Sequence, residues 1–298
     1  MNKYKNLLFY KYTKIEQPER VKYEQMGICN ALELKGRIIV AKEGLNATLE
    51  GRRHNINKYI EYMKTLKGFE NIDFKVSEST GNAYPRLSVK VRNEIVSAHL
   101  EEDFDPNETS GKYIYSEELH EWFRNGKEFY LVDMRNDYEQ VSGHFQGSIN
   151  SNFENFRDLP KIKEKIGHLM DKTIVTVCTG GVRCEKASGY LVKCGFKDVY
   201  QLYGGIQTYM SKYPGEDWLG KLYVFDKRTL IDFTKGTDKK HPVVGKCTAC
   251  GNPTENYIDC LRPECHAHQL VCEDCIEKFG GKPYCSQECA NLAENGNK

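Results

Sequence analysis

Apolar and polar positions recur with two different periods along the first hundred residues. Apolar residues at every second position predict strands, and apolar residues three or four positions apart predict helices. The resulting order is strand, helix, strand, strand, helix, strand, at residues 7–12, 19–34, 37–41, 46–50, 56–66 and 74–77. The middle strands form a hairpin that turns through Lys42-Glu43-Gly44, and LSVKVRNEIVSA after Pro85 adds one more strand. A βαββαβ order is typical of a ferredoxin-like domain, predicted here for residues 1–100.

A different pattern follows an acidic stretch, EEDFDPNETS, which contains proline and lacks periodicity. This composition predicts a linker at residues 101–112. From residue 113 to residue 215, strands alternate with helices, and the clearest strands are FYLVDMR and residues 173–177 and 199–202. Such alternation predicts an α/β domain with a parallel sheet. In these sheets the ligand lies at the carboxyl ends of the strands.

Residues 174–188, IVTVCTGGVRCEKAS, combine a buried strand with a loop that cannot continue it. Paired glycines end the strand, and a helix is predicted from Cys184. The backbone N–H groups of such a loop and the positive end of the helix dipole form a cup for an anion. A thiol in this cup ionises below the ordinary pKa of about 8.5. Cys178 is therefore a candidate nucleophile.

The spacing between Cys178 and Arg183 indicates what the cup holds. The loop of a thiol phosphatase has one more residue between cysteine and arginine and encloses a phosphate. The shorter loop suits a single sulfur atom. A buried structural cysteine is the alternative, and two glycines and an arginine in the loop disfavour it. The residues that intervene are Thr179, Gly180, Gly181 and Val182.

Eight of the twelve cysteines lie between residues 247 and 289, in the pattern C-x2-C-x9-C-x4-C-x6-C-x2-C-x9-C-x3-C. Two nearly repeated sets of four thiols predict two tetrahedral structural zinc sites. A segment this short with few large apolar side chains needs metal to fold. An iron–sulfur centre, disulfides or a single occupied site are the alternatives. The predicted ligands are Cys247, Cys250, Cys260, Cys265, Cys272, Cys275, Cys285 and Cys289.

The grouping of these ligands is open, because sequential and crossed pairing both fit the spacing. His266 and His268 are spare donors in the same segment, and we interpret them as exposed or hydrogen-bonded side chains. The chain is thus predicted to combine an α+β domain, an α/β domain and a C-terminal region, residues 216–298, that contains a Cys-rich zinc-binding module.

Composition excludes several classes of protein. With 39% hydrophobic and 29% charged residues, the chain is neither disordered nor fibrous. No apolar run approaches the roughly 20 residues that span a bilayer. The basic N-terminus lacks the small-residue cleavage site of a signal peptide. Clustered cysteines in such a chain indicate an intracellular, metal-binding protein, which we expect in the cytoplasm.

Charge is unevenly distributed along the chain. The first 100 residues hold 18 Lys and Arg against 11 Asp and Glu, a net charge of +7, and the remainder carries −6. A basic first third is a candidate surface for a polyanion, with ordinary solvated charges as the alternative. The candidate phosphate contacts are Lys42, Arg86, Lys90 and Arg92.

Several segments in the order of the rhodanese domain resemble its signature. They are YLVDMRNDYEQVSGHFQGSIN, the loop CTGGVR and the closing segment VYQLYGGIQTYMSKYP. The first contains an Asp-x-Arg pair, an acidic residue and a Gly-His-x-x-Gly motif. The matching residues are Asp133, Arg135, Glu139, Gly143, His144, Gly147, Ser148, Ile149 and Asn150.

This resemblance implies roles for several residues. Cys178 would carry a persulfide, and Arg183 would stabilise the anionic sulfur through charge-assisted hydrogen bonds. Asp133 and Arg135 would brace the site as an ion pair. His144 would have a structural role in packing the turn.

The whole chain is similar to a narrower group, the tRNA uridine(34) hydroxylase family. The shared segments are GRIIVAKEGLNATLEG, LSVKVRNEIV, CTGGVRCEKAS and the trailing cysteine block. The resemblance implies oxygen-dependent hydroxylation of the wobble uridine of tRNA to 5-hydroxyuridine, with Cys178 as the reactive cysteine. It also implies the tRNA anticodon loop as partner and molecular oxygen as co-substrate.

The residues suggest one way to use the thiol. A sulfur nucleophile that adds to C6 of uracil raises the electron density at C5, where oxygen then reacts. The sequence contains no flavin or nicotinamide fingerprint and no 2-His-1-carboxylate set for iron. Single-stranded anticodon bases can be turned out into a protein pocket.

Two other functions remain open from the sequence. One is a rhodanese-type sulfurtransferase that carries a persulfide on Cys178 and passes it on by exchange at sulfur. Cys184 would resolve that persulfide or, in the simpler interpretation, pack in the first helical turn. The other is a zinc scaffold without catalysis that binds RNA or protein, which needs no preorganised anion cup.

Overall fold

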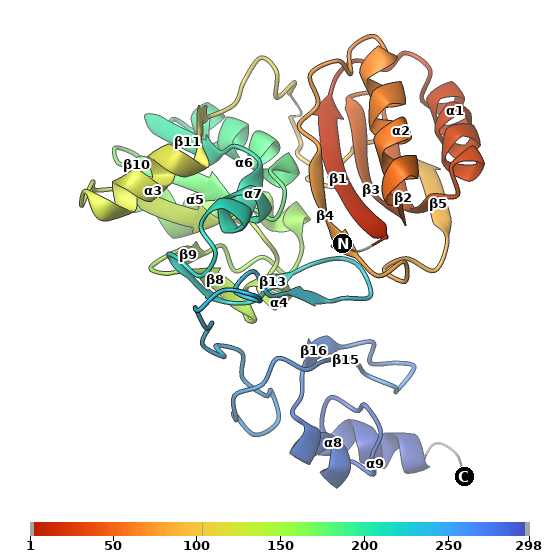
Figure 1. Cartoon of the computed structure of the whole chain (residues 1–298). Coiled ribbons are helices and arrows are strands. Elements are labelled where there is room, and N and C mark those ends of the chain that lie inside the picture. The colour runs from red at the N-terminus through yellow and green to blue at the C-terminus, as the bar shows by residue number, and fades with distance from the viewer. Residues whose placement is uncertain (1–2, 103, 296–298) are drawn as a thin grey trace.

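The computed structural model describes residues 3–102 and 104–295, which form three successive units along the chain (Figure 1). Residues 1–2, 103 and 296–298 belong to the predicted N-terminal domain, linker and C-terminal region, and they lie outside the described residues. Within the described ranges, no helix is long and apolar enough to cross a membrane.

The N-terminal domain has the βαββαβ order that its hydrophobic pattern predicts. Its strands form one sheet in the order β4-β1-β3-β2-β5, in which β5 runs parallel to β2 and the other neighbours are antiparallel. The added strand β5 confirms the prediction for the segment after Pro85. The elements are β1 (Tyr4–Tyr12), α1 (Pro18–Ala31), β2 (Lys35–Ala41), β3 (Gly44–Arg52), α2 (Arg53–Thr65), β4 (Lys75–Ser79) and β5 (Leu87–Val91).

The alternation of residues along β1 decides which face of this sheet the helices cover. Leu7 and Phe9 are fully buried in a core with Tyr59 of α2, and successive side chains of a strand point to opposite faces. The other face carries no helix and turns toward the central domain (Figure 1). We call it the open face. Strand pairing places on it Asn6, Leu8 and Tyr10 of β1, Ser77 of β4, Thr48 of β3 and Arg37 of β2.

Helix α1 ends at Ala31, three residues before the predicted end at residue 34. Glu33 has a φ of +53°, and the N–H of Leu34 donates to the carbonyl of Cys29 at 2.8 Å. A left-handed residue just past a helix, with such a backward hydrogen bond, closes the last turn. The apolar Leu34 maintains the helical period in the sequence although its backbone has left the helix.

The central domain contains the parallel sheet that its alternating pattern predicts. The strand order is β6-β11-β10-β7-β9, and every neighbouring pair is parallel. Alternate residues of β10 point into separate cores, Ile174 on one side of the sheet and Val175 and Val177 on the other. The elements are β6 (Lys112–Ile114), α3 (Ser116–Arg124), β7 (Tyr130–Asp133), α4 (Asp137–Gln140), β8 (Gly143–Phe145), β9 (Ile149–Asn150), η1 (Phe156–Lys161), α5 (Ile162–Ile166), η2 (Gly167–Leu169), β10 (Thr173–Val177), α6 (Val182–Lys193), β11 (Asp198–Leu202) and α7 (Gly205–Lys212).

The predicted linker, residues 101–112, packs against α6, and its last residue begins β6. The N–H of Gly111 donates to Ser188 Oγ at 2.8 Å, and Lys186 Nζ donates to the carbonyl of Phe104 at 3.2 Å. A Cβ on Gly189 would lie 2.3 Å from the carbonyl oxygen of Thr109, so the chain passes directly over the helix. The described part of this segment is therefore held to the central domain.

The chain continues into the central core beyond the predicted boundary at residue 215. Strand β12 (Trp218–Gly220) pairs with β8, and Trp218 and Leu222 are buried in the core that contains Val175. Strands β13 (Leu222–Tyr223) and β14 (Leu230–Ile231) form an antiparallel pair that we call hairpin 222–231.

Hairpin 222–231 reaches the N-terminal domain at its tip. The N–H of Lys227 donates to the carbonyl of Ala83 at 3.0 Å, and Arg228 Nη1 donates to the carbonyl of Glu78 at 3.3 Å. The hairpin therefore belongs to the central core at its base and touches the N-terminal sheet at its tip.

The C-terminal unit is small and rich in cysteine. It contains the antiparallel strands β15 (Tyr257–Asp259) and β16 (His268–Leu270), followed by α8 (Glu273–Lys278) and α9 (Gln287–Asn295). Tyr257 Oη donates to the carbonyl of Tyr138 in the central domain. Tyr223 Oη of hairpin 222–231 lies 3.0 Å from His268 Nε2. The Cys-rich unit thus supports both α4 and hairpin 222–231.

Candidate functional site

Cys178 follows β10 directly, at the carboxyl end of the middle strand of the parallel sheet. Helix α6 begins at Val182, so Val182 and Arg183 form its first turn; this corrects the predicted loop through Arg183 and helix start at Cys184. The turn depends on Gly181, whose φ of +102° lies in the region that favours glycine. The N–H of Gly181 donates to Cys178 Sγ at 3.2 Å, as an anion cup requires.

The closing segment LYGGIQ holds the other side of the loop. The N–H groups of Ile206 and Gln207 donate to the carbonyls of Cys178 and Thr179, at 2.9 and 3.0 Å. A Cβ on Gly205 would lie 2.6 Å from the carbonyl oxygen of Cys178, so this position requires glycine. The first turn of α7 therefore fixes the backbone of the reactive loop.

The surroundings of Cys178 favour its thiolate. Burial by itself raises the pKa of a thiol. A hydrogen bond from the Cys184 thiol, the positive charge of Arg183 and the backbone N–H groups of Cys184 and Gly181 act in the opposite direction and lower the pKa of Cys178 to about 6. Burial raises the pKa of Cys184 well above its usual range, so this neighbour remains a thiol and a donor.

Arg183 makes its hydrogen bonds to Glu139 rather than to the sulfur that the sequence interpretation assigned to it. Its Nη1 donates to Glu139 Oε1, and its Nη2 donates to Glu139 Oε2 at 2.8 Å and to Thr179 Oγ1 at 3.2 Å. The side chain of Glu139 is fully buried and that of Arg183 is nearly so. Glu139 thus orients the guanidinium, which acts on Cys178 through its charge.

Glu139 is a site residue to which the sequence interpretation gave no role, although its position within the signature was the available signal. It lies in α4, 44 residues before Arg183, and only the tertiary structure brings the two together. Its Oε1 also accepts from the backbone N–H of Asn136 at 3.0 Å as part of a capping box. The same carboxylate therefore closes the start of α4 and holds the active-loop arginine.

Asp133 and Arg135 lie close together as a fully buried ion pair, in the arrangement expected from the Asp-x-Arg motif. Arg135 Nη2 donates to Asp133 Oδ2 at 2.6 Å, and the same group donates to the carbonyl of Gly143 at 2.7 Å. His144 lies in β8, and its Nδ1 is 3.2 Å from the carbonyl of Gln140. All three side chains tie β7, α4 and β8 together and lie behind the loop.

The N-terminal domain covers the reactive loop. Cys178 is fully buried, and Leu8 of the open face packs so closely that a Cβ on Gly180 would lie 2.7 Å from Leu8 Cδ2. Tyr10 Oη donates to Glu185 Oε1 at 2.9 Å, and Tyr12 Oη donates to the carbonyl of Val182 at 3.3 Å. The thiol therefore lies at the contact between two domains, and a large reactant reaches it only when this contact opens.

The four candidate phosphate contacts remain exposed. Lys90 lies on the edge strand β5, Arg86 and Arg92 flank that strand, and Lys42 lies in the β2–β3 turn. None of them forms an ion pair with a carboxylate in the described part of the chain. Arg37, which the sequence interpretation did not select, lies on the open face opposite Thr48. These cations follow β2 and β5 rather than surround Cys178.

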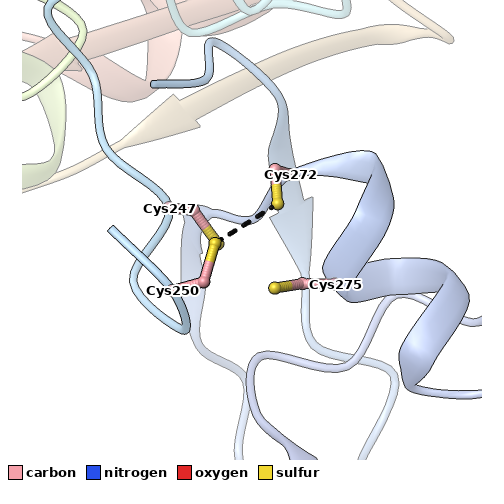
Figure 2. Close-up of side chains that lie close together, drawn as sticks. All are labelled: Cys247, Cys250, Cys272 and Cys275. Carbon is pink, nitrogen blue, oxygen red and sulfur yellow. Dashed lines mark hydrogen bonds between the residues drawn. The ribbon is translucent and has the colours of Figure 1, made fainter. Parts of the chain in front are cut away.

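The eight clustered cysteines form two groups of four in the described residues. Cys247 and Cys250 meet Cys272 and Cys275, and Figure 2 shows their sulfurs turned toward one another. The second group is Cys260, Cys265, Cys285 and Cys289. The pairing is therefore crossed, which resolves the alternative left open by the spacing.

Both groups fit a tetrahedral thiolate site. The sulfurs of each group lie within 4.8 Å of one another, and Cys250 Sγ and Cys272 Sγ are 3.6 Å apart. Zn–S bonds of about 2.3 Å place tetrahedral sulfurs roughly 3.8 Å apart. His268 belongs to neither group, because its Nδ1 lies 2.7 Å from Asp259 Oδ1 and its Nε2 contacts Tyr223.

Three family models match successive parts of the chain. The UPF0176 acylphosphatase like domain matches residues 4–95, the Rhodanese-like domain matches residues 116–212, and the Rhodanase C-terminal model matches residues 219–290. The central parallel sheet with Cys178 is thus a rhodanese-like domain, preceded by an acylphosphatase-like domain.

Curated relatives match almost the whole chain. A tRNA uridine(34) hydroxylase of Staphylococcus carnosus (strain TM300) is 45% identical over 296 residues, which cover 98% of this chain and 91% of that protein. A protein of the same name from Acholeplasma laidlawii (strain PG-8A) is 43% identical and covers 96% of this chain and 89% of its own. The chain belongs to the tRNA uridine(34) hydroxylase family. The resemblance seen in the sequence is confirmed.

In this member of the hydroxylase family, a Glu139→Gln substitution is expected to destabilise the rhodanese-like domain by about 3–5 kcal/mol, because it removes the buried carboxylate that pairs with the Arg183 guanidinium. Urea unfolding followed by tryptophan fluorescence measures this domain selectively, since Trp122 and Trp218 both lie in its core. Glu128→Gln is the matched control, because Glu128 pairs with Lys172 on the surface and its loss costs less than about 1 kcal/mol. Equal unfolding midpoints for both variants would contradict the assigned role of Glu139.

Alkylation of Cys178 in the folded hydroxylase-family protein is expected to follow a titration near pH 6. Because the pKa is lowered, the reactive thiolate persists above that pH and is lost as the pH falls through it, by about tenfold per pH unit. Iodoacetamide labelling, quantified for each peptide by mass spectrometry, measures the profile. Burial raises the pKa of Cys29 to about 12, so this thiol is the unreactive internal control. A midpoint for Cys178 at or above about 8.5 would show an unactivated thiol.

Proposed function

We propose that this protein hydroxylates the wobble uridine of tRNA to 5-hydroxyuridine, with molecular oxygen as co-substrate and Cys178 as the reactive cysteine. The observation that carries the proposal is the similarity, over 96–98% of the chain, to relatives that are named tRNA uridine(34) hydroxylase. The geometry supports it, because an activated thiol lies where a helix-free sheet meets the rhodanese-like domain.

The chemistry proposed for Cys178 starts from its thiolate. Addition of the sulfur to C6 of uracil raises the electron density at C5, where oxygen reacts, and loss of the sulfur restores the ring. The C5–H bond is replaced by a C5–O–H bond with one atom of O2. The second oxygen atom becomes water at the expense of two electrons and two protons from a thiol reductant. Arg183, held by Glu139, stabilises the anionic sulfur by its charge, and Asp133 and Arg135 brace the loop behind it.

The backbone of the loop is proposed to hold the anionic sulfur. The N–H of Gly181 donates to Cys178 Sγ in the cup that Thr179, Gly180 and Val182 complete, and hydrogen bonds to backbone N–H groups favour a charged form. Persulfide on Cys178 would occupy the same cup, so a rhodanese-type sulfurtransferase is the alternative function.

The tRNA is proposed to bind through its anticodon loop. Lys42, Arg86, Lys90 and Arg92 are the proposed phosphate contacts, and we add Arg37 because it lies on the open face. We assign residues 1–100 as a ferredoxin-like domain, residues 113–215 as the rhodanese domain, whose core β12 and the base of hairpin 222–231 extend, and residues 216–298 as the C-terminal region that supplies those strands, an assignment that the three family matches support. The expected site of action is the cytoplasm, where tRNA is modified.

The C-terminal Cys-rich module is proposed to bind two structural Zn2+ ions through the two cysteine groups. Thiolate ligands and sulfur spacing support zinc. The metal would fold a unit whose buried cluster consists largely of its own cysteines with few large apolar residues. Through Tyr257 and His268, the folded unit then supports α4 and hairpin 222–231 beside the reactive loop.

Mass spectrometry of tRNA nucleosides tests the proposal. In cells that lack this protein and any redundant pathway, 5-hydroxyuridine and its derivatives are expected to disappear, and the full-length chain is expected to restore them. Undiminished 5-hydroxyuridine in the deleted cells would reject the hydroxylase. Persulfide transfer by the purified protein to a thiol acceptor, together with undiminished 5-hydroxyuridine, would support the sulfurtransferase instead.

A further inference from the structure

A small pocket of about 50 Å³ lies beside the reactive loop, between the open face, the loop and hairpin 222–231. Asn6 and Ser77 line it from the sheet, Thr179 from the loop, and Phe225 and Asp226 from the hairpin. It is far smaller than the clefts of about 300–1,000 Å³ that hold drug-sized ligands, so it suits a single small group. Thr179 directly follows Cys178 in the chain, so the pocket borders the loop that carries the thiol.

Two polar atoms of this pocket lack a partner within the described ranges. Asn6 Oδ1 and Ser77 Oγ are both buried and make no hydrogen bond there. Asn6 is only 3% exposed, and it lies directly opposite Ser77 in the β1–β4 pair. A buried polar atom without a partner costs free energy, because it has lost its hydrogen bonds to water. A bound ligand with a donor for Asn6 Oδ1 and a group for the Ser77 hydroxyl would remove that cost.

The orientation of the Asn6 amide is determined by its neighbour. Asn6 Nδ2 donates to Asp226 Oδ2 at 3.3 Å. A carboxylate only accepts hydrogen bonds, so it selects the NH2 end of the amide and leaves the carbonyl oxygen for the ligand. Asp226 is itself held by Arg228, whose Nε donates to Asp226 Oδ1 at 2.7 Å. The amide therefore offers an acceptor and resists the flip that would offer a donor.

An aromatic ring completes the pocket. Phe225 is 45% exposed, and its ring centroid lies 5.9 Å from Arg183 Cζ, the arginine of the active loop. Exposed aromatic rings stack on single-stranded bases, because every base has a π-face. Phe225 thus lines the pocket together with Asn6 and Ser77, and its ring also faces the Arg183 guanidinium.

We propose that this pocket binds the uracil base and selects it against cytosine through Asn6. The N3–H of uracil donates to Asn6 Oδ1, the Ser77 hydroxyl donates to a uracil carbonyl, and Phe225 stacks on the ring. Cytosine carries an unprotonated N3, which is an acceptor and would face the acceptor Oδ1. This inference rests on the proposed function, because it takes the substrate base to be uracil.

A second pocket, of about 90 Å³, has among its described lining residues no polar side-chain atom that needs a ligand as a hydrogen-bond partner. It is lined by Tyr10, Tyr113 and Glu185 among others, and Glu185 already accepts from Tyr10, Tyr113 and Gln201 at 2.8–2.9 Å. The Glu185 carboxylate thus already accepts three hydrogen bonds, so no ligand is required to satisfy it. The pocket beside Thr179 is the one with unfilled hydrogen-bonding capacity.

Binding of two anticodon stem-loop RNAs tests the proposal. They differ only in U or C at the wobble position, and fluorescence anisotropy with full-length, zinc-loaded protein gives both dissociation constants. The wild-type protein is expected to bind the U-containing RNA about tenfold more tightly or better, since one good base contact discriminates by this order. Asn6→Leu is expected to reduce the ratio to near one while the affinity for the C-containing RNA is maintained by its phosphate contacts.

Two further variants make the result decisive. Ser77→Ala removes a hydroxyl that has no partner, so it is expected to fold normally and to lower the U preference. It therefore tests the proposal even if Asn6→Leu fails to fold. Asn46→Leu is the matched control, because Asn46 Nδ2 already donates to the carbonyl of Ile95 and lies outside the pocket. Its ratio is expected to equal that of the wild type. A wild type without U preference, or folded Asn6 or Ser77 variants that keep it, would overturn the proposal.

Nucleoside analysis with the same variants separates this inference from the proposed function. Formation of 5-hydroxyuridine by the wild type, together with an unchanged U preference in the Asn6 and Ser77 variants, rejects the pocket and leaves the function. A U preference that Asn6→Leu abolishes, in a wild type that forms no 5-hydroxyuridine, supports the pocket and rejects the hydroxylation.

Discussion

A Cys178→Ser variant is expected to form no measurable 5-hydroxyuridine, a loss of at least about 10³-fold, because a serine hydroxyl does not ionise in a cup that lowers the pKa of a thiol to about 6. Serine is nearly isosteric with cysteine and can still receive the N–H of Gly181, so the fold should persist. The measurement is nucleoside mass spectrometry of tRNA from cells that contain only the variant, together with thermal unfolding of the purified protein.

Two other cysteines serve as controls for this result. Cys194 ends the last turn of α6, away from the loop, and Cys194→Ser is expected to retain full activity. Cys184→Ser keeps a donor toward Cys178 Sγ, whereas Cys184→Ala removes it and is expected to shift the alkylation midpoint of Cys178 upward. Normal 5-hydroxyuridine in a folded Cys178→Ser protein would exclude covalent catalysis by this sulfur. Inactivity of Cys184→Ser with an unshifted midpoint would instead give Cys184 a direct role in the chemistry.

If the two cysteine groups bind zinc as proposed, removal of the metal is expected to unfold the Cys-rich module completely, because structural zinc contributes on the order of 10–16 kcal/mol to folding of such units at neutral pH. The crossed grouping makes a sharper prediction. The double variant Cys250→Ser/Cys272→Ser removes two ligands of one site and should lose one zinc per chain. The double variant Cys250→Ser/Cys260→Ser removes one ligand from each site and should lose both.

Zinc stoichiometry by elemental analysis distinguishes these outcomes. A sequential grouping would reverse them, since Cys250 and Cys260 would then share a site and Cys250 and Cys272 would not. Two bound zinc ions in the wild type are the reference. Loss of the module should also loosen hairpin 222–231, because its Tyr223 would lose His268 as a hydrogen-bonding partner.

The order of elements in the N-terminal domain follows from the sequence because it depends on local properties. Alternation along β1 and the 3.6-residue period in α2 are properties of neighbouring residues, and both elements formed within a few residues of the predicted bounds. The end of α1 could not be predicted from the sequence, because Leu34 fits the helical period although Glu33 has already left the helix with a positive φ. A pattern of side chains does not report a left-handed backbone.

In the reactive loop, too, the sequence predicted the local features but not the contacts between distant residues. The strand, the glycines and Cys178 were readable, because a nucleophile after a buried strand is a local pattern. The pairing of Arg183 with Glu139 was not, because the two residues are 44 positions apart and only the folded chain brings their charges together. The hydrogen bond between Asn6 and Asp226 could not be predicted for the same reason, because these residues are 220 positions apart.

By itself, the sequence determined the succession of a βαββαβ unit, a parallel α/β unit and a cysteine cluster, and it singled out Cys178 as the candidate nucleophile. Only the tertiary structure decided which cysteines share a site, where the guanidinium points, and that the open face of the first domain covers the thiol of the second. The physical reason is that hydrophobic period and turn residues act over a few positions. Ion pairs, sulfur groupings and domain contacts depend on distances in space that many different chain paths satisfy.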